Sequence, residues 1–329
     1  MKKAIYIFSS GRLSRKENTI VLETEEGRKV IPISTVSELK VFGELELNKR
    51  VLEFLTKNQV PVHFFNHYGY YVGSYHPRDF VNSGLITLKQ AQYFLDTEKR
   101  LYLAKSFVAG AVQNMLKNLS YYNRRGKTLT DEIREIEETS KHIGKATSIR
   151  ALMQIEGEAR KIYYQAFNKI VDIEGFEFDK RTKRPPQNPL NALISFGNSM
   201  LYTTALSEIY RTHLDPRIGY LHETNRRSFT LNLDISDVFK PIIVDRLIFS
   251  LLNKKQIKLK HFEEEIEYSY LNERGRRIFV SEFEEKLKTT LRYRNLGKVS
   301  YRKLIRLECY KLYKHFLDEE IYTPFVGMW

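Results

Sequence analysis

Glu156 is the first side chain whose position suits chemistry, because it lies in a stretch of helical periodicity over 147–172. On a helix it shares a row with Arg160, whereas Glu158 projects about 200° away, so the two acids do not share a face. Gly157 costs roughly 1 kcal/mol in a helix interior relative to alanine, which suggests that something approaches the backbone closely there. The spacing alone also allows an ordinary i,i+4 surface pair of Glu156 with Arg160.

His222 precedes Asp234 and Asp237, which lie at the start of an apolar helix predicted over 235–252. One imidazole with two or three carboxylates makes a hard, oxygen-rich site that suits Mg²⁺ or Mn²⁺ better than zinc. The alternative is structural: Asp234 would be an N-cap, Asp237 would complement the helix dipole in the first turn, and His222 would be a satisfied structural residue. The spacing by itself leaves both interpretations open.

Basic residues lie where a phosphate group would need them, since Arg226, Arg227 and Lys240 flank the histidine and aspartate positions. Carboxylates packed near one another raise each other's pKa unless a cation neutralises them, so this site makes sense mainly with metal present. Its chemistry would be phosphoryl transfer, in which a divalent ion polarises a non-bridging oxygen and lowers the pKa of an attacking water or sugar hydroxyl. A second basic cluster lies in the loop at 174–189 and consists of Lys180, Arg181, Lys183 and Arg184.

The net charge calls for a polyanionic partner. Of 329 residues, 54 are Lys or Arg and 40 are Asp or Glu, which leaves a formal net charge of +14. Residues 1–80 hold 12 basic and 9 acidic residues, a net of +3, so residues 81–329 carry the remaining +11. This charge points to nucleic acid, or failing that to an anionic membrane surface. We expect the polyanion to meet mainly the second part of the chain.

The composition also excludes several classes of protein. Hydrophobic residues make up 42% and charged residues 29%, which rules out a disordered or collagen-like chain. No run approaches the roughly 20 apolar residues that cross a bilayer, and the chain does not start with a cleavable apolar stretch, so we expect a cytoplasmic protein with no membrane partner. The single cysteine, Cys309, excludes an internal disulfide and a multi-thiolate zinc site. A bound metal must therefore use oxygen and imidazole ligands.

The periodicity predicts an α+β fold: a small β-rich domain over 1–76, a linker over 77–85, and a larger all-α domain over 86–329. Strands are predicted over 3–8, 19–24, 30–33, 38–42, 62–65 and 70–75. Asn48 is predicted to cap a short amphipathic helix. Helical periodicity starts at about 86, and later helices are predicted over 130–142, 147–172, 190–213, 235–252, 277–292 and 299–317. The candidate acids thus lie in or beside helices of the second domain.

Four ordered motifs carry a resemblance to a known family. They are Ile155-Glu156-Gly157 with Ala159-Arg160 and Tyr163, the string from Asn191 to Tyr202, the string from Ile218 to His222, and Leu233 to Asp237 followed by Lys240 to Arg246. In this order they resemble the spacer-acquisition integrases of CRISPR systems, the first-numbered CRISPR-associated protein. The resemblance covers most of the chain, because the β-rich start and all-α remainder also look like that family. The ending Tyr322-Thr323-Pro324-Phe325 resembles the type I-B branch.

The resemblance implies a metal site. In the family a glutamate, a histidine and the second aspartate of an Asp-x-x-Asp pair hold the ion, and these match Glu156, His222 and Asp237. Asp234 matches the first aspartate, which lies near the metal or supports it, and Lys240 matches a basic position near the active site. The implied cofactor is Mg²⁺ or Mn²⁺.

A helix beside the active site is also implied, and Asn191, Ser195 and Tyr202 match positions on it. Asn198 departs from the family, in which many relatives have an aromatic residue there. This departure leaves the ligand set intact and changes the local wall. The predicted DNA contacts are Lys180, Arg181, Lys183, Arg184, Arg226 and Arg227.

The activity that the resemblance implies is integration of short double-stranded DNA fragments into a CRISPR array. A 3′-hydroxyl of the fragment attacks a phosphodiester of the repeat in a transesterification, and with water as nucleophile the same site would act as a metal-dependent endonuclease. The family acts as a homodimer through its β-rich domain. Two such dimers are bridged by a dimer of the smaller second-numbered CRISPR-associated protein.

Two other classes of protein compete with this interpretation. A non-catalytic DNA-binding scaffold would use the basic helix over 298–314 and the cluster over 180–184 to contact phosphates, and the acids would be caps and salt bridges. A mononuclear iron oxygenase would normally need two histidines on the metal, and His213 is the only nearby spare. A metal requirement for strand transfer distinguishes the integrase from the scaffold.

Overall fold

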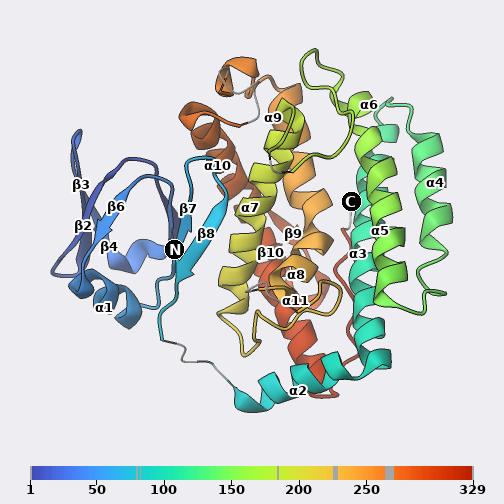
Figure 1. Cartoon of the computed structure of the whole chain (residues 1–329), viewed down its shortest axis with the longest axis horizontal. Helices are drawn as coiled ribbons and strands as arrows, with labels where there is room; N and C mark the ends of the chain where they lie inside the picture. Colours follow the sequence, from blue (N-terminus) through green and yellow to red (C-terminus); the bar gives the residue numbers. More distant parts are fainter. Residues whose placement is uncertain are drawn as a thin grey trace. The chain divides into compact units, whose positions relative to one another are not determined.

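The computed structural model describes residues 2–78, 81, 83–183, 185–224, 229–263 and 270–327. The chain forms two compact units, Met1–Phe80 and Val81–Trp329, and the boundary between them falls within the segment 77–85 (Figure 1). Strands make up most of the first unit, and helices make up most of the second. The predicted fold class, a β-rich part followed by a larger helical part, is confirmed.

Two four-stranded sheets build the first unit. One has the order β1 (Lys3–Ile7), β5 (Val36–Val41), β7 (Val62–Phe65), β8 (Tyr71–Tyr75). In it β1, β5 and β7 run parallel, and β8 pairs antiparallel with β7. The other has the order β4 (Gly27–Pro32), β3 (Thr19–Thr24), β2 (Gly11–Lys16), β6 (Leu45–Leu47). Here β2, β3 and β4 form an antiparallel ladder, and β6 joins β2 in parallel.

Two of these strands, β2 and β6, are not evident from the sequence pattern. Leu13 is the one buried residue of β2, so the strand lacks the run of alternating apolar residues that marks a half-buried strand. Its pairing with β3 on one side and β6 on the other supplies the backbone hydrogen bonds that its side chains do not predict.

Helix α1 (Lys49–Lys57) begins where the sequence predicts, because the Asn48 side chain accepts a hydrogen bond from the Val51 N–H at 3.1 Å. Its apolar side packs into a single core to which both sheets contribute. Leu13 from β2 and Leu39 from β5 are both fully buried in that core. The first unit is therefore closed around its own hydrophobic interior.

Helices dominate the second unit. They are α2 (Gly84–Leu95), α3 (Thr97–Asn123), α4 (Thr130–Ser140), α5 (Ile149–Gln165), α6 (Phe167–Val171), α7 (Pro189–Ile209), α8 (Leu231–Lys240), α9 (Arg246–Asn253), α10 (Glu273–Lys288) and α11 (Tyr301–Phe316). A short hairpin of β9 (Thr290–Arg292) and β10 (Lys298–Ser300) separates the last two helices. The expectation of an all-α domain misses this hairpin. The helix predicted over 277–292 instead spans 273–288, and the helix predicted over 299–317 spans 301–316.

Helix α8 lies at the centre of the second unit, packed against α3 on one side and α7 on the other (Figure 1). Every residue of α7 except Tyr202 is buried, as expected of a helix surrounded by other helices. The helix predicted to begin at 235 in fact begins at Leu231. This shift places Asp234 and Asp237 inside the helix rather than at its start.

Helix α8 runs into a π-helical turn, η2 (Pro241–Asp245), before α9 begins. Pro241 has no N–H to donate, so the regular i→i−4 ladder cannot continue through it. Two buried asparagines of α3 satisfy carbonyl groups at this irregularity: Asn114 donates to Val238 at 2.8 Å, and Asn118 donates to Pro241 at 3.1 Å. The π-helical turn that follows α8 is thus stabilised by hydrogen bonds from α3.

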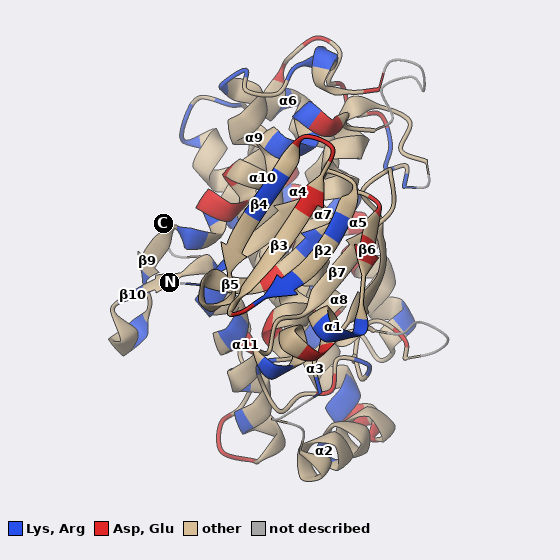
Figure 2. Cartoon of the chain, turned by 90° about the vertical axis from the view of Figure 1, so that its left-hand side faces the viewer, with Lys and Arg blue, Asp and Glu red and all other residues tan. Residues whose placement is uncertain are grey.

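No helix of the described residues has both the length and the apolar character to cross a lipid bilayer. Figure 2 shows basic and acidic residues interspersed along the strands of the first unit. This mixture agrees with its small net charge of 12 basic minus 9 acidic residues, or +3, over residues 1–80.

Candidate active site

Asp234 organises the segment that carries His222. Its carboxylate accepts four hydrogen bonds: from the N–H groups of Tyr220 at 2.6 Å, Leu221 at 3.1 Å and His222 at 3.0 Å, and from His222 Nδ1 at 2.8 Å. A carboxylate has about four lone-pair sites, so this buried group is saturated. The N-cap interpretation of Asp234 is wrong, because Thr230 is the N-cap of α8. Asp234 instead accepts hydrogen bonds from the backbone of residues 220–222.

The histidine segment is also held by its backbone. Gly219 donates its N–H to Thr230 Oγ1 at 2.9 Å, and a Cβ at this glycine would lie 2.8 Å from the Thr230 carbonyl carbon. Only a glycine allows so close an approach. Arg100 of α3 donates from Nε to the Tyr220 carbonyl at 3.1 Å. These contacts bring residues 219–222 against the first turn of α8.

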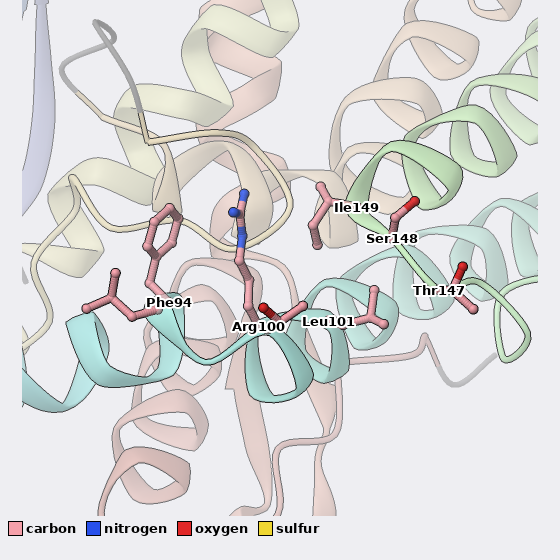
Figure 3. Close-up of a pocket in the computed structure, with 8 residues that line it drawn as sticks. Phe94, Arg100, Leu101, Thr147, Ser148 and Ile149 are labelled. Carbon is pink, nitrogen blue, oxygen red and sulfur yellow. The ribbon is translucent and has the colours of Figure 1, made fainter.

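A cavity of about 280 Å³ adjoins Arg100, between the start of α3 and the first turn of α5 (Figure 3). It is lined by Phe94, Leu95, Thr97, Arg100, Leu101, Thr147, Ser148 and Ile149. None of these residues is acidic, so the cavity is not the metal site that the sequence predicts. The Arg100 guanidinium lies 4.3 Å from the centre of the Phe94 ring, which supports the side chain that holds Tyr220.

Arg160 lies between two of the predicted metal ligands. Its Nε forms a short hydrogen bond with Glu156 Oε1, and its Nη2 lies 3.1 Å from Asp237 Oδ1 as an ion pair without the alignment of a hydrogen bond. Glu156 is only 8% exposed, so the surface-pair interpretation of Glu156 and Arg160 is wrong. Glu158 is exposed, in agreement with its predicted place on another face of α5.

Asp237 is the meeting point of the cluster. Besides Arg160, it forms a short contact from Oδ1 to Lys240 Nζ, and its Oδ2 lies 3.9 Å from His222 Nε2. Lys240 is itself held over the ring of Tyr202, the one incompletely buried residue of α7, at 4.7 Å. His222 and Asp237 therefore lie side by side, and Glu156 is joined to Asp237 through Arg160.

The buried charges shift one another's pKa. Burial alone would raise the pKa of Asp237, but Lys240, Arg160 and His222 outweigh it and hold the pKa well below its usual range. Burial would lower the pKa of His222, but the hydrogen bond to Asp234 and the charge of Asp237 raise it above its ordinary value. The pKa of Lys240 is likewise raised, because Asp237 outweighs burial. Cations of the chain thus neutralise the acids.

The donor set fits a hard divalent cation. Asp234 takes the Nδ1 side of His222, which leaves Nε2 directed toward Asp237, the arrangement that prepares a histidine to bind a metal. Among the described residues, however, no three such donors converge to coordination distance. The Arg160 guanidinium between Glu156 and Asp237 accounts for this, since it occupies the space between the two carboxylates.

The predicted wall residues of α7 have different partners: Tyr202 lies against Lys240, whereas Asn191 and Ser195 bind the 174–189 loop. Asn191 and Ser195 accept hydrogen bonds from Arg181, each at 2.9 Å, and so fasten the 174–189 loop to the start of α7. Asn198 is 8% exposed, and its Oδ1 has no hydrogen-bond partner among the described residues. The departure at this position therefore leaves a polar group in the wall where an aromatic ring was expected.

The predicted DNA contacts differ in their surroundings. Lys180 and Lys183 are exposed, whereas Arg181 is partly buried against α7. Arg184, Arg226 and Arg227 lie outside the described residues. In the C-terminal basic helix, Arg302 and Arg306 pair with the buried Glu208, so these two cations are engaged within the unit.

Two features of the site are not evident from the sequence. One is that Arg160 bridges two acids, because its spacing from Glu156 fits a surface pair equally well. The other is Asp245 at the end of η2, which is 1% exposed and lies among the charges of Arg160, Lys240 and Arg181. In the sequence, Asp245 directly follows the apolar string Pro241 to Val244, and this pattern indicates that its carboxylate is buried. Gly157, in contrast, has no part of the described chain near the place of its absent Cβ.

Comparison with known proteins decides the family. The family model described as CRISPR associated protein Cas1 matches residues 5–285. The chain belongs to the Cas1 family. This confirms the resemblance found in its motifs, while the type I-B branch stays a prediction.

Relatives of this Cas1 chain match it over its full length. "CRISPR-associated endonuclease Cas1 2" of Thermodesulfovibrio yellowstonii is 54% identical over 100% of both chains. "CRISPR-associated endonuclease Cas1" of Thermotoga maritima is 50% identical over 97% of this chain and 98% of its own. A solved Cas1 protein from Thermotoga maritima superposes with a TM-score of 0.88 at 49% identity, covering 99% of each chain. A casposase bound to integration product shares the fold, with a TM-score of 0.90 at 21% identity over 99% of this chain and 94% of its own.

Proposed function

We propose that this Cas1 chain is a metal-dependent DNA integrase and endonuclease of CRISPR adaptation. The observation that carries the proposal is the linked set His222, Asp234 and Asp237, with Glu156 joined to it through Arg160. The names of the curated relatives, CRISPR-associated endonucleases, support nuclease chemistry. The casposase neighbour was solved bound to integration product, which supports strand transfer as the related activity.

In this proposal Glu156, Asp237 and Nε2 of His222 bind Mg²⁺ or Mn²⁺. Such an ion supplies a Lewis acid for the phosphoryl oxygens and lowers the pKa of the attacking hydroxyl. Asp234 holds the imidazole by Nδ1, so that Nε2 keeps its lone pair. His222 is the most exposed of these side chains, at 20%, so the DNA backbone reaches the site from its side.

The bond changes are those of a transesterification. The 3′-hydroxyl oxygen of a DNA fragment forms a bond to the phosphorus of the repeat, and its proton leaves. The bond from that phosphorus to the 3′-oxygen of the repeat strand breaks, and the departing oxygen takes up a proton. When water replaces the hydroxyl, the same displacement gives a nick. Lys240, buried beside Asp237, is placed to stabilise negative charge that develops on the phosphoryl group.

Two partners belong to the proposal. The β-rich unit is the surface for a homodimer, and a dimer of the second-numbered CRISPR-associated protein bridges two of these dimers. Fold neighbours solved as a Cas6-RT-Cas1–Cas2 complex support the second partner, the first of them with a TM-score of 0.84 at 18% identity. That neighbour is a longer chain, of which this chain covers 36%.

A strand-transfer assay tests the activity. The purified chain, with and without its small partner, joins a labelled fragment to a half-site DNA in Mn²⁺ but not in EDTA. Glu156→Ala, His222→Ala and Asp237→Ala each reduce the rate by at least about a hundredfold, because each removes a proposed metal ligand. Glu158→Ala is the matched control, since Glu158 is exposed on another face of the same helix. Full activity of the His222→Ala protein in Mn²⁺ would contradict the proposal and favour the non-catalytic scaffold.

A further inference from the structure

Asp245 has no assigned role and an unusual environment. Asp245 is the last residue of the π-helical turn η2 and is only 1% exposed. Neither of its carboxylate oxygens has a hydrogen-bond partner among the described residues. The Tyr163 hydroxyl lies close enough to favour the ionised form but makes no hydrogen bond within the usual limits. Buried polar atoms are nearly always paired, so an unpaired buried carboxylate needs an explanation.

The charges around Asp245 are positive. Those that act on it are Arg160 of α5, Lys240 of α8 and Arg181 of the 174–189 loop, with Arg160 the strongest of the three. Burial nevertheless raises the pKa of Asp245 to about 7, because none of these cations forms a direct contact with it. The metal-free chain therefore keeps a buried, unpaired carboxyl group near Arg160, and this group becomes an anionic acceptor when it gives up its proton.

Metal binding would leave the Arg160 guanidinium without its present anionic partners. Its two acidic partners, Glu156 and Asp237, are both proposed metal ligands. If Glu156 and Asp237 were to hold a divalent ion, their carboxylates could no longer both pair with the guanidinium. The side chain is only 14% exposed, so Arg160 cannot simply turn into water. A buried guanidinium left without an anion is costly, so metal binding requires another acceptor for it.

We propose that Asp245 is the second partner of Arg160: the guanidinium moves from Glu156 and Asp237 to the Asp245 carboxylate when a divalent metal binds. The inference rests on the proposed function, because it presupposes that these two acids bind metal. Asp245 is then a positioning residue, which acts on the metal site only through Arg160. Arg160 in turn competes with the metal until Asp245 receives it.

A double-mutant cycle on Mn²⁺ affinity tests this exchange. The proteins are the wild-type chain, Asp245→Asn, Arg160→Gln and the double variant, each titrated with Mn²⁺ by calorimetry without DNA. We expect Asp245→Asn to weaken Mn²⁺ binding about tenfold or more, because the displaced guanidinium then has no anion to join. Arg160→Gln removes the competitor and leaves binding equal to wild type or tighter. In the Arg160→Gln background, Asp245→Asn changes the affinity less than about threefold.

The cycle separates this exchange from simple attraction between Asp245 and the metal. If Asp245→Asn weakens Mn²⁺ binding equally in both backgrounds, its charge acts directly and the exchange is wrong, although the metal site stands. If the wild-type chain does not bind Mn²⁺, the proposed function itself fails. Glu308→Gln is the matched control: Glu308 is 1% exposed, bonded to Tyr322 at 2.6 Å, and touches none of the proposed ligands, so it alters the melting temperature but not Mn²⁺ affinity. Asp245→Ser serves as the second variant if Asp245→Asn does not fold.

Discussion

The His222 ring is fixed by Asp234, whose Oδ1 accepts from Nδ1 at 2.8 Å while the same carboxylate binds three backbone N–H groups of residues 220–222. One buried acid therefore sets both the position of the histidine segment and the tautomer of its ring. Because Asp234 lies three residues before Asp237 on α8, the central helix carries a proposed ligand, Asp237, together with the residue that supports His222, a second proposed ligand. The family pattern of two aspartates thus has two different physical roles.

Replacing Asp234 by asparagine tests that support. The asparagine side chain could accept at only one atom, so several of the four hydrogen bonds to the histidine segment are lost. We expect Asp234→Asn to lower the free energy of unfolding by about 3 kcal/mol and Mn²⁺ affinity by about 10–100-fold. Urea unfolding and calorimetry measure the two effects. Glu308→Gln, which also replaces a buried carboxylate, is the control and is expected to lower the free energy of unfolding without changing Mn²⁺ affinity. If Asp234→Asn likewise lowers only the free energy of unfolding, Asp234 does not support the metal ligand.

The pH dependence of stability reports on Asp245 in the metal-free chain. Burial raises its pKa to about 7 from an ordinary 3.8. Between about pH 4 and 7 the folded chain therefore keeps a proton that the unfolded chain has released, so stability falls as pH rises through this window and then levels off. The charged and titratable groups that face it are Arg160, Tyr163 and Tyr164 of α5, Lys240 of α8 and Arg181 of the loop.

An asparagine in place of Asp245 removes this titration. The unfolding free energy of Asp245→Asn minus that of the wild-type chain is expected to grow from pH 4 to 7 by up to roughly 4 kcal/mol and to stay constant above pH 7. Urea unfolding in EDTA at half-unit steps of pH measures the difference, in which the other groups cancel. A difference independent of pH over this range would show that Asp245 is ionised in the folded chain throughout.

Gly157 gives a test of how DNA approaches Glu156. A Cβ at this position would meet nothing within 4 Å, and the residue is exposed in α5. Gly157→Ala is therefore expected to raise the unfolding free energy by about 0.5–1 kcal/mol. If the DNA backbone passes over this turn, the same methyl group slows strand transfer at least about fivefold. Glu158→Ala is the control on the neighbouring position, and undiminished strand transfer by Gly157→Ala would exclude a close approach there.

The sequence predicts the order of the β-rich and helical parts well, because this order depends on local patterns. The Asn48 cap and the strands with alternating apolar residues follow from short-range chemistry. The mostly polar strand β2, with Leu13 as its one buried residue, is not predicted, since its place in the sheet comes from pairing with β3. The N-cap interpretation of Asp234 likewise fails because its partners lie in a segment more than ten residues upstream along the chain.

The geometry of the site depends on contacts that no local pattern contains. Arg160 and Glu156 are neighbours on one helix in either interpretation, and only the approach of Asp237 from α8 turns a surface pair into a buried bridge. Asp245 lies in an apolar string that ends a π-helical turn, and its neighbours come from α5 and the 174–189 loop. Burial and ion pairing at such positions depend on tertiary contacts. The sequence therefore identifies candidate residues but does not predict which of them form ion pairs.

Lys183 and Arg181 are close in sequence, but replacing each by alanine is expected to affect a different property: DNA binding for Lys183 and the free energy of unfolding for Arg181. Lys183 is exposed, and partial desolvation together with the charges of Arg181 and Lys240 lowers its pKa, which places it in the positive field of the site. Lys183→Ala should therefore weaken DNA binding and reduce the slope of log K against log salt by about 1. Arg181 instead donates to Asn191 and Ser195, so Arg181→Ala should cost about 1–3 kcal/mol of unfolding free energy. Fluorescence anisotropy at several KCl concentrations and urea unfolding check both, and an unchanged salt slope for Lys183→Ala would remove Lys183 from the DNA-binding surface.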